Sequence, residues 1–473
     1  MPELILAIDI GTTSTRAAVV GPDGAFAGLA AAPLTSATPA PGRVEQDAWA
    51  VWTATRRAIT EALAAAGRQP ADIAAIGVTT QRASAVAWDR ATGQALSPMV
   101  VWSDLRGATR AGELAQAGFM LAPQQAATKL ESLLASVDAP PGGIAWGNID
   151  SYIIFQLTGG ATHATDRSQA WPSGYLSFPD LGWNERLIDY QGLDPAMFPA
   201  LVDTWGAIGM TDARVFGAAV PISADVADQQ SALIAHGGAV GTAKISFGTS
   251  ATFDLATGTN FIFPGPSIPP LLVSSVDGDT RWCVEGMVLS AGSALDWLRE
   301  TLGLGGHSAF GALAGSVPDA CGAAFLPALQ GLGAPHGDPA CRGALRGLTA
   351  SVSRAHIARA GLEGLAFRAR EVLDHVYVLD AFDAPEVIGV DGGLSASPLF
   401  LQTLADLTGR SIRRHATPEA TLLGAAICAG RGAGLLAETD IAAMRRFEPA
   451  IHPTIAEDES RARFAAWRGA VYG

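Results

Sequence analysis

The chain has 473 residues, of which 49% are hydrophobic and 16% are charged, and it contains 54 glycines. This length and composition exclude a single small core and extended disorder, and they are typical of a globular protein with about two or three domains. Its 31 basic and 45 acidic residues give a net charge of −14, which argues against a nucleic-acid or anionic-membrane partner and favours small substrates.

Strand and helix patterns alternate through the first part of the chain. Residues 4–20 form two β-prone runs around the turn Gly11-Thr12-Thr13-Ser14, which predicts a hairpin, and a third strand candidate follows. Residues 47–67 have an acidic cap, apolar residues at helical spacing and a final glycine, which predicts a helix. Further predictions are strands at 73–78 and 85–88 and a helix at 149–157. This alternation indicates an α/β fold.

A later segment repeats the design of the first hairpin. Gly248-Thr249-Ser250 lies between β-prone runs at 243–247 and 251–255, and the proline-rich interval 260–270 predicts a loop after them. The repetition predicts two halves of similar design. We place the boundary near 237–241 and therefore expect domains of residues 1–238 and 239–473.

The N-terminus and the cysteines bear on the cellular compartment. The first apolar run carries Glu3 and Asp9 and follows no basic segment, which predicts neither a signal peptide nor a membrane span. The wide cysteine spacing matches neither a metal clamp nor a disulfide framework. We therefore expect isolated, buried thiols and a cytoplasmic protein. The cysteines are Cys283, Cys321, Cys341 and Cys428.

The two glycine-hydroxyl turns carry the first functional prediction. Glycine permits close approach, and the backbone N–H groups and hydroxyls of such a turn are available to hold an anion such as phosphate. Asp9, just before Gly11, is suited to hold a hydrated Mg²⁺ that neutralises the phosphates. A single turn of this kind is more often an ordinary turn with an Asx-type cap. Two turns in matching contexts favour phosphate binding.

Several other nucleotide-binding and hydrolytic sites are not supported by the sequence. It contains no GxxxxGK[ST] motif and no GxGxxG in a strand-to-helix context, which argues against P-loop and Rossmann sites. The segment 248–252 departs from a hydrolase nucleophile elbow at its last position, Thr252. No histidine pair has the spacing of a zincin.

The ordered motifs give the chain a specific family resemblance. It resembles the FGGY carbohydrate kinases, and within them the glycerol kinase branch, over nearly its whole length. The resemblance implies two actin-like (ribonuclease H-like) domains with an interdomain cleft, and ATP-dependent phosphorylation of a small polyol or sugar. The motifs are AIDIGTTS (7–14), GVTTQR (77–82), VVWSDLR (100–106), NIDSYIIFQLTG (148–159), ADQQ (227–230), FGTS (247–250), EGMVLSAGS (285–293), GLGAP (331–335), VDGG (390–393) and TLLGAA (421–426).

The resemblance also implies roles for individual residues. Asp228 corresponds to the catalytic base, although its position before an apolar helix equally fits an N-cap, and both roles are compatible. The acceptor residues implied are Arg82, Ala83, Trp102, Gln124, Asp228, Gln229 and Phe253. The nucleotide residues implied are Gly11, Thr12, Thr13, Arg16, Gly248, Thr249, Gly292, Asp296, Gly392, Gly393 and Ser397, with Asp391 in the same glycine-rich motif.

The acceptor positions depart from the glycerol kinase pattern. Ala83 stands where an acidic residue is expected and Gln124 where a tyrosine is expected. A site that loses hydroxyl-binding groups discriminates against its former substrate, so we expect a longer polyol or a ketose in place of glycerol. The alternative is a nucleotide-binding regulatory or sensor protein without turnover, and a nucleotide hydrolase or chaperone ATPase is less compatible with Arg82, Trp102 and Gln229. A homodimer is expected by analogy.

Overall fold

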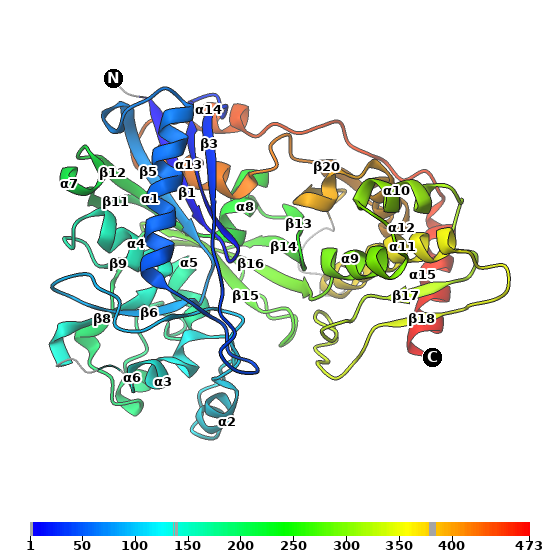
Figure 1. The fold of residues 1–473 in the computed structure, drawn as a ribbon, viewed down its shortest axis with the longest axis horizontal. Coiled ribbons are helices and arrows are strands. Elements are labelled where there is room, and N and C mark those ends of the chain that lie inside the picture. The colour runs from blue at the N-terminus through cyan, green and yellow to red at the C-terminus, as the bar shows by residue number, and fades with distance from the viewer. Residues whose placement is uncertain (1–2, 136, 138–140, 378–384) are drawn as a thin grey trace. The chain divides into compact units, whose positions relative to one another are not determined.

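The chain folds into two compact units, which Figure 1 shows in a computed structural model that describes residues 3–135, 137, 141–377 and 385–473. Unit 1 comprises Met1–Ala235, Leu271–Arg281 and Thr421–Arg445. Unit 2 comprises His236–Pro270, Trp282–Ala420 and Arg446–Gly473. The sequence patterns gave no sign that the two later segments, 271–281 and 421–445, pack with the first part of the chain.

Unit 1 is built on a six-stranded sheet with the order β11-β12-β5-β1-β2-β3. Its strands are β1 (Leu4–Ile10), β2 (Ser14–Val20), β3 (Phe26–Pro33), β5 (Ile73–Thr80), β11 (Trp205–Met210) and β12 (Pro221–Ala227). Strands β1, β2 and β3 are antiparallel neighbours, whereas β1, β5 and β12 run parallel. The predicted hairpin of residues 4–20 is therefore confirmed, and the predicted third strand is β3.

Helix α1 (Ala48–Ala65) covers β2 and β3. It begins where predicted, because the Asp47 carboxylate accepts hydrogen bonds from the N–H groups of Trp49 and Ala50. Gly28 on β3 permits the close packing, since a Cβ there would lie 2.2 Å from the Ala62 carbonyl oxygen. Helix α4 (Ile149–Leu157) has the predicted bounds and is buried on nearly every side.

The remaining elements of unit 1 surround this sheet. A four-stranded sheet has the order β4-β7-β6-β8, with β4 (Glu45–Gln46), β6 (Ala85–Asp89), β7 (Met99–Val100) and β8 (Ile144–Asn148). Strand β9 (Ala164–Asp166) pairs with β10 (Ala200–Val202). The other helices are α2 (Ala108–Gln116), α3 (Leu130–Leu134), α5 (Arg167–Ala170), α6 (Glu185–Tyr190), α7 (Ala213–Phe216), α8 (Asp228–His236), α13 (Ala420–Gly432) and α14 (Glu438–Met444).

Unit 2 repeats the strand arrangement of unit 1. The part of the second six-stranded sheet that lies in unit 2 has the order β16-β14-β13-β19-β20. The strands are β13 (Ala243–Phe247), β14 (Ala251–Gly258), β16 (Asp279–Val288), β19 (Val387–Asp391) and β20 (Ser411–Arg414). Strand β15 (Pro270–Val276) falls almost wholly in the segment 271–281 of unit 1. Strands β13, β14 and β16 are antiparallel neighbours, and β13, β19 and β20 are parallel. These directions match those of β1, β2, β3, β5 and β12, which confirms the predicted repetition of design.

Long helices complete the core of unit 2. Helix α11 packs against α10, α12 and the short strand β17. Buried leucine, alanine and phenylalanine side chains from these elements and from the main sheet form one cluster. The elements are α9 (Gly292–Thr301), α10 (His307–Gly315), β17 (Ala324–Leu326), β18 (Ala344–Arg346), α11 (Arg354–Tyr377), α12 (Pro398–Thr408) and α15 (Glu457–Tyr472).

The four cysteines do not share one environment. Cys283 and Cys428 are buried, as predicted, but Cys321 is exposed and Cys341 is half-buried. The prediction was wrong for these two because they lie in connections before β17 and between β17 and β18, and not in a core element. Within the described ranges, no helix combines the length and apolar composition needed to cross a lipid bilayer.

Candidate functional site

Three adjacent parallel strands of unit 1 end at one edge of the sheet. Ile10 at the end of β1 and Ala227 at the end of β12 both pair with Thr80 at the end of β5. The turn at 11–13, the Gln81-Arg82 segment and Asp228 follow these strands directly. In open α/β sheets, ligands bind outside the carboxyl ends of the strands. This edge is the candidate site of unit 1.

Asp9 and Arg16 face each other across the first hairpin. They are cross-strand partners, and Nη1 of Arg16 lies 4.0 Å from Oδ2 of Asp9. The Gly11 N–H donates to the Ser14 carbonyl and closes the turn, in which Thr12 is half-buried and Thr13 is exposed. The structure therefore brings together the five residues that the sequence predicted for the first phosphate turn.

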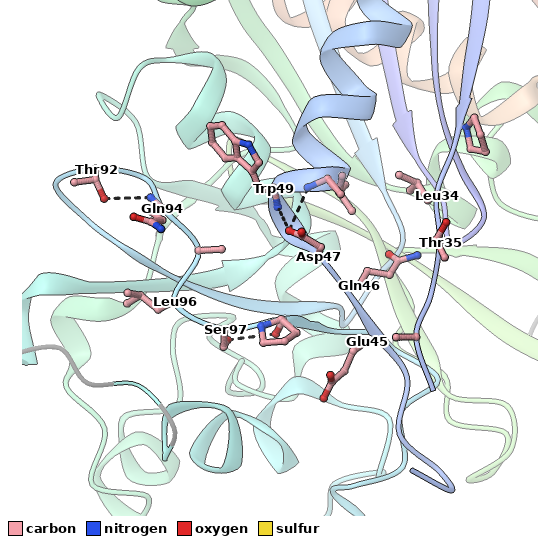
Figure 2. Close-up of a pocket in the computed structure, with 16 residues that line it drawn as sticks. Leu34, Thr35, Glu45, Gln46, Asp47, Trp49, Thr92, Gln94, Leu96 and Ser97 are labelled. Atoms are coloured by element: carbon pink, nitrogen blue, oxygen red, sulfur yellow. Dashed lines mark hydrogen bonds between the residues drawn. The ribbon is translucent and has the colours of Figure 1, made fainter. Parts of the chain in front are cut away.

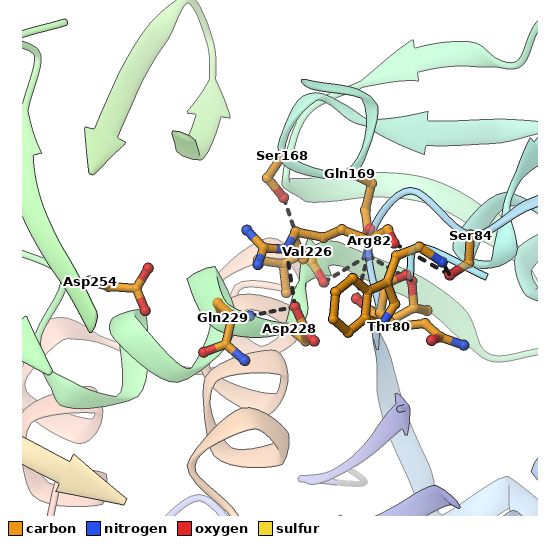
Figure 3. Close-up of polar contacts among 12 residues, drawn as sticks. Thr80, Arg82, Ser84, Ser168, Gln169, Val226, Asp228, Gln229 and Asp254 are labelled. Atoms are coloured by element: carbon orange, nitrogen blue, oxygen red, sulfur yellow. Dashed lines mark hydrogen bonds and ion pairs between the residues drawn. The ribbon is translucent and has the colours of Figure 1, made fainter. Parts of the chain in front are cut away.

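Asp228 is the first residue of α8, and its carboxylate has two partners in Figure 3. Oδ1 accepts a hydrogen bond of 2.8 Å from the Gln229 N–H and lies 3.4 Å from Nε of Arg82. A guanidinium and a helix N-terminus both favour the ionised form of a carboxyl group. The Asp228 side chain keeps 24% of its surface exposed, so its carboxylate is accessible to a ligand.

Residues of α5 hold the strand end before Asp228. The Ala227 N–H donates to Oγ of Ser168, which in turn donates to Oδ1 of Asp166. Nε2 of Gln169 donates to the Val226 carbonyl and to Oγ1 of Thr80. Sequence reasoning missed this support, because α5 is far from β12 in the chain and has no motif of its own.

Unit 1 also contains three buried carboxyl groups close to α5. They belong to Asp150, Asp166 and Asp225, which have no exposed surface. Oδ2 of Asp225 accepts from the Asp166 N–H, and Oδ2 of Asp150 accepts from Oγ1 of Thr165. Burial raises the pKa of Asp166 to about 7. Burial and the two neighbouring carboxylates raise the pKa of Asp225 well above its usual value. The cluster therefore holds a proton at pH values where exposed carboxyl groups are ionised.

Replacing Asp225 with asparagine is expected to stabilise the protein at neutral pH. In wild type, the raised pKa values mean that the folded state binds more protons than the unfolded state above about pH 4, so stability falls as pH rises towards 7. The asparagine side chain of the variant is uncharged at every pH. Its thermal midpoint should therefore exceed that of wild type at pH 7.5. Each kcal/mol gained in the free energy of unfolding should raise the midpoint by about 2–4 °C.

The difference between the two midpoints is expected to shrink towards pH 4. Thermal unfolding of both proteins at several pH values measures it, and the exposed Asp180→Asn exchange is the control for loss of one carboxylate. A difference that stays constant with pH would contradict the prediction.

The predicted acceptor residues are only partly brought together. Trp102 is half-buried, and its indole N–H donates to Oγ1 of Thr12 in the predicted phosphate turn, over 3.0 Å. Ala83 follows Arg82 with a φ of 52°, a left-handed conformation that is uncommon for residues other than glycine. Gln124 is exposed. Phe253 lies in the hydrophobic core of unit 2, where all of β14 is buried, and its role at the acceptor stays a prediction.

The second predicted phosphate turn, in unit 2, contacts two of the predicted glycines. The Gly292 N–H donates to the Gly248 carbonyl, and a Cβ at Gly292 would lie 2.5 Å from that oxygen. Gly392 has a φ of +83°, and a Cβ there would lie 2.3 Å from the Phe247 carbonyl oxygen. Strands β13 and β19 are parallel neighbours, so the turn with Thr249 and the glycine pair after β19 occupy one edge.

The other predicted nucleotide residues have structural partners of their own. Ser397 is the N-cap of α12 and accepts from the Phe400 N–H, whereas Gly393 is exposed. Asp296 on α9 lies 3.4 Å from Nε of Arg299. Burial alone would raise the pKa of Asp391, but a hydrogen bond from His236 and the charge of Lys244 hold it below its usual value.

A cavity of about 1070 Å³ lies in unit 1 among the segments 33–37, 45–51 and 92–98 (Figure 2). Trp49, which is 53% exposed, and the capping residue Asp47 are part of its wall. Among the described residues that line this cavity, none belongs to the predicted acceptor or nucleotide set. One of them, Gln46, donates to the Thr12 carbonyl of the phosphate turn.

Comparisons with known proteins agree with this geometry. Residues 4–235 match the FGGY family of carbohydrate kinases, N-terminal domain, and residues 243–433 match the C-terminal domain of the same family. A glycerol kinase from Thermus brockianus is 36% identical over 483 aligned residues, which cover 99% of this chain and 97% of that protein. A glycerol kinase from Geobacter sp. (strain M21) is 38% identical, with 97% of each chain covered.

Solved structures show the same fold. Glycerol kinase from Plasmodium falciparum with ADP superposes with a TM-score of 0.91 at 24% identity, covering 99% of this chain and 97% of that chain. A xylulose kinase from Rhodospirillum rubrum has a TM-score of 0.82 at 26% identity, with 98% of each chain covered. The predicted fold class of two actin-like α/β domains is confirmed, and the protein is a kinase that acts on a carbohydrate or polyol. The chain belongs to the FGGY family of carbohydrate kinases.

Proposed function

We propose that this kinase transfers the γ-phosphoryl group of ATP to a hydroxyl of a small polyol or sugar, with Asp228 as the base. The observation that carries the proposal is the position of the Asp228 carboxylate. It follows the end of β12, at the same edge of the sheet as the turn that follows β1, and it is partly exposed and held by Arg82 and the Gln229 N–H.

The chemistry of alcohol phosphorylation accounts for such a group. The attacking oxygen forms a bond to the γ-phosphorus while the bond to the leaving oxygen of ADP breaks, and the hydroxyl proton passes to Asp228. The transition state is loose, so alignment and charge stabilisation supply most of the rate enhancement. The contact with Arg82 fixes the direction of the Asp228 carboxylate and thereby the position of the accepting oxygen.

Asp9 is our candidate ligand for Mg²⁺. Mg²⁺ with a nucleotide is commonly held by one or two carboxylates plus phosphate oxygens and water. A single carboxylate that is 6% exposed next to a predicted phosphate turn fits this donor set. When bound, the ion would neutralise phosphate charge.

The two halves of the chain would then have separate tasks. We propose that residues 1–238 bind the acceptor and that residues 239–473 bind the nucleotide through the second turn and the glycines packed on it. The shared edge favours this assignment, because the second turn and the glycine pair after β19 both follow the ends of neighbouring strands. A homodimer and a cytoplasmic location remain predictions.

Acceptor choice would follow from the residue after Arg82. The Ala83 side chain is a methyl group in a left-handed backbone conformation, 6% exposed, and it offers no hydrogen bond where an acidic residue was expected. A missing acceptor weakens binding of a hydroxyl that would otherwise pair with it. We therefore propose that a longer polyol or a ketose is preferred over glycerol.

An assay of ADP release with glycerol and a panel of four- and five-carbon polyols and ketoses tests this function. Wild type is expected to show its highest kcat/KM with a longer acceptor, and Ala83→Glu is expected to shift the ratio towards glycerol by about tenfold or more. Ala64→Glu, on the exposed face of α1, is the control for the added charge. Glycerol as the best wild-type substrate would contradict the selectivity, and ATP binding without turnover on any acceptor would contradict the kinase proposal.

A further inference from the structure

Three residues of unit 1 form a closed ring of hydrogen bonds next to the candidate site, through their side chains and one backbone carbonyl. Oγ1 of Thr12 donates to Oε1 of Gln81 over 2.9 Å, and Nε2 of Gln81 donates to Oε1 of Gln46 over 3.3 Å. Nε2 of Gln46 closes the ring by donating to the Thr12 carbonyl over 2.7 Å. The indole N–H of Trp102 joins it by donating to Oγ1 of Thr12 over 3.0 Å.

Two of these groups fix the direction of every bond in the ring. The Thr12 carbonyl can only accept, so the amide nitrogen of Gln46 must face it and its oxygen must face Gln81. The Trp102 indole can only donate, so the Thr12 hydroxyl accepts from it and directs its own proton to Gln81. The arrangement is therefore satisfied in only one orientation of both glutamine amides.

The ring connects parts of the chain that are far apart in sequence. Thr12 lies in the phosphate turn, Gln46 on β4, Gln81 after β5, and Trp102 after β7. Both glutamines are 2% exposed. A buried polar group that loses its partner costs about 1–3 kcal/mol, so no member can be removed without affecting the others.

Gln81 and Trp102 connect the ring to the residues of the proposed reaction. Gln81 precedes Arg82, whose guanidinium pairs with Asp228. Trp102 is held by two more contacts, from its own N–H to Oγ of Ser84 and from Nζ of Lys129 to its carbonyl. Lys129 has no exposed surface, so the backbone of Trp102 is fixed independently of the ring.

We propose that Gln46 and Gln81 are positioning residues that set the phosphate turn in register with the acceptor side formed by Arg82 and Trp102. This inference rests on the proposed function. The two glutamines act through Thr12, and the side chain of Gln46 reaches the turn from a strand that carries none of the residues assigned to the reaction.

Removal of either amide is expected to impair catalysis. In Gln46→Met and Gln81→Met, kcat/KM for the acceptor should fall about tenfold or more, because small misplacements of reacting groups cost such factors. Since both amides serve one ring, the double variant should lie within about twofold of the worse single variant. If the two amides acted independently, the fold-losses in kcat/KM of the single variants would multiply in the double variant.

Gln156→Met is the matched control. Gln156 is half-buried in the same unit, and its Nε2 donates to the Gly93 carbonyl over 2.6 Å. This variant loses a comparable bond to a backbone carbonyl away from the ring. Its thermal midpoint should fall, but its kcat/KM should stay within about twofold of wild type.

Gln46→Glu provides a milder variant with its own signature. The introduced carboxyl group can donate to the Thr12 carbonyl only while protonated, and its ionised form would repel that oxygen. Burial raises the pKa of a carboxyl group at this position, so the ratio of kcat/KM in Gln46→Glu to that in wild type should fall about tenfold between pH 5.5 and pH 8. A ratio that stays constant with pH would contradict the role of this hydrogen bond.

A measurement without turnover separates this inference from the proposed function. The ¹⁵N–¹H signal of the Trp102 indole, assigned through Trp102→Phe, should shift in Gln46→Met, although Gln46 is two hydrogen bonds away. An unchanged signal, or glutamine variants that match Gln156→Met in kcat/KM, would overturn the positioning role. Wild type without activity on any acceptor, but with the indole shift present, would contradict only the proposed function.

Discussion

Replacing Asp228 with asparagine is expected to lower kcat by about 10³-fold, the range of a general base, while the affinity for ATP changes less than about twofold. Asparagine keeps the shape of the side chain and can still accept from the Gln229 N–H. It cannot take up the proton of the acceptor hydroxyl. The loss should therefore appear in turnover and not in nucleotide binding.

Steady-state kinetics and calorimetric titration with ATP measure the two quantities. Asp189→Asn, at an exposed position of α6, is the control for loss of one carboxylate and should retain wild-type turnover. If Asp228→Asn turned over acceptor at near wild-type rates, Asp228 would not be the base, although the family membership would stand.

Replacing Lys244 with methionine is expected to destabilise the protein by about 3–5 kcal/mol. Nζ of Lys244 lies 2.8 Å from Oδ2 of Asp254, and neither side chain has exposed surface. Burial alone would lower the pKa of Lys244, but the carboxylates of Asp254 and Asp391 outweigh it and raise the pKa. The variant leaves the Asp254 charge buried without its cation.

The double exchange Lys244→Met with Asp254→Leu should recover most of this loss, because a hydrophobic pair of similar volume replaces a buried ion pair at little cost. Urea unfolding of the single and double variants measures both effects. Arg281→Met, which removes the exposed ion pair with Asp279, should cost less than about 1 kcal/mol. A single variant as stable as wild type would refute the role of the buried pair.

Local patterns were sufficient to locate many of the helices and strands. The bounds of α4 agree with the predicted helix, and α1 begins after Asp47 as its cap requires. Such elements depend on side-chain periodicity and on capping bonds between residues three or four positions apart. The repeated glycine-hydroxyl turns were visible for the same reason, since a turn between two strands is also a local feature.

The sequence was less informative about burial. Phe253 is assigned to the acceptor by resemblance, and the sequence did not show that its side chain lies in a core to which distant helices contribute. No sequence pattern distinguished Asp150, Asp166 and Asp225 from other acidic residues. Only packing shows that they are buried together, and their raised pKa values follow from that burial.

By itself, the amino-acid sequence determined the α/β class, the repeated hairpins and the residues that follow the central strands, because each depends on neighbours in the chain. Only the tertiary structure decided which strands lie side by side and therefore which of their ends meet. It alone brings Gln46 to Thr12 and Arg82 to Asp228. Hydrogen bonds and ion pairs depend on distance in space, and the folding of the sheet sets that distance for residues far apart in sequence.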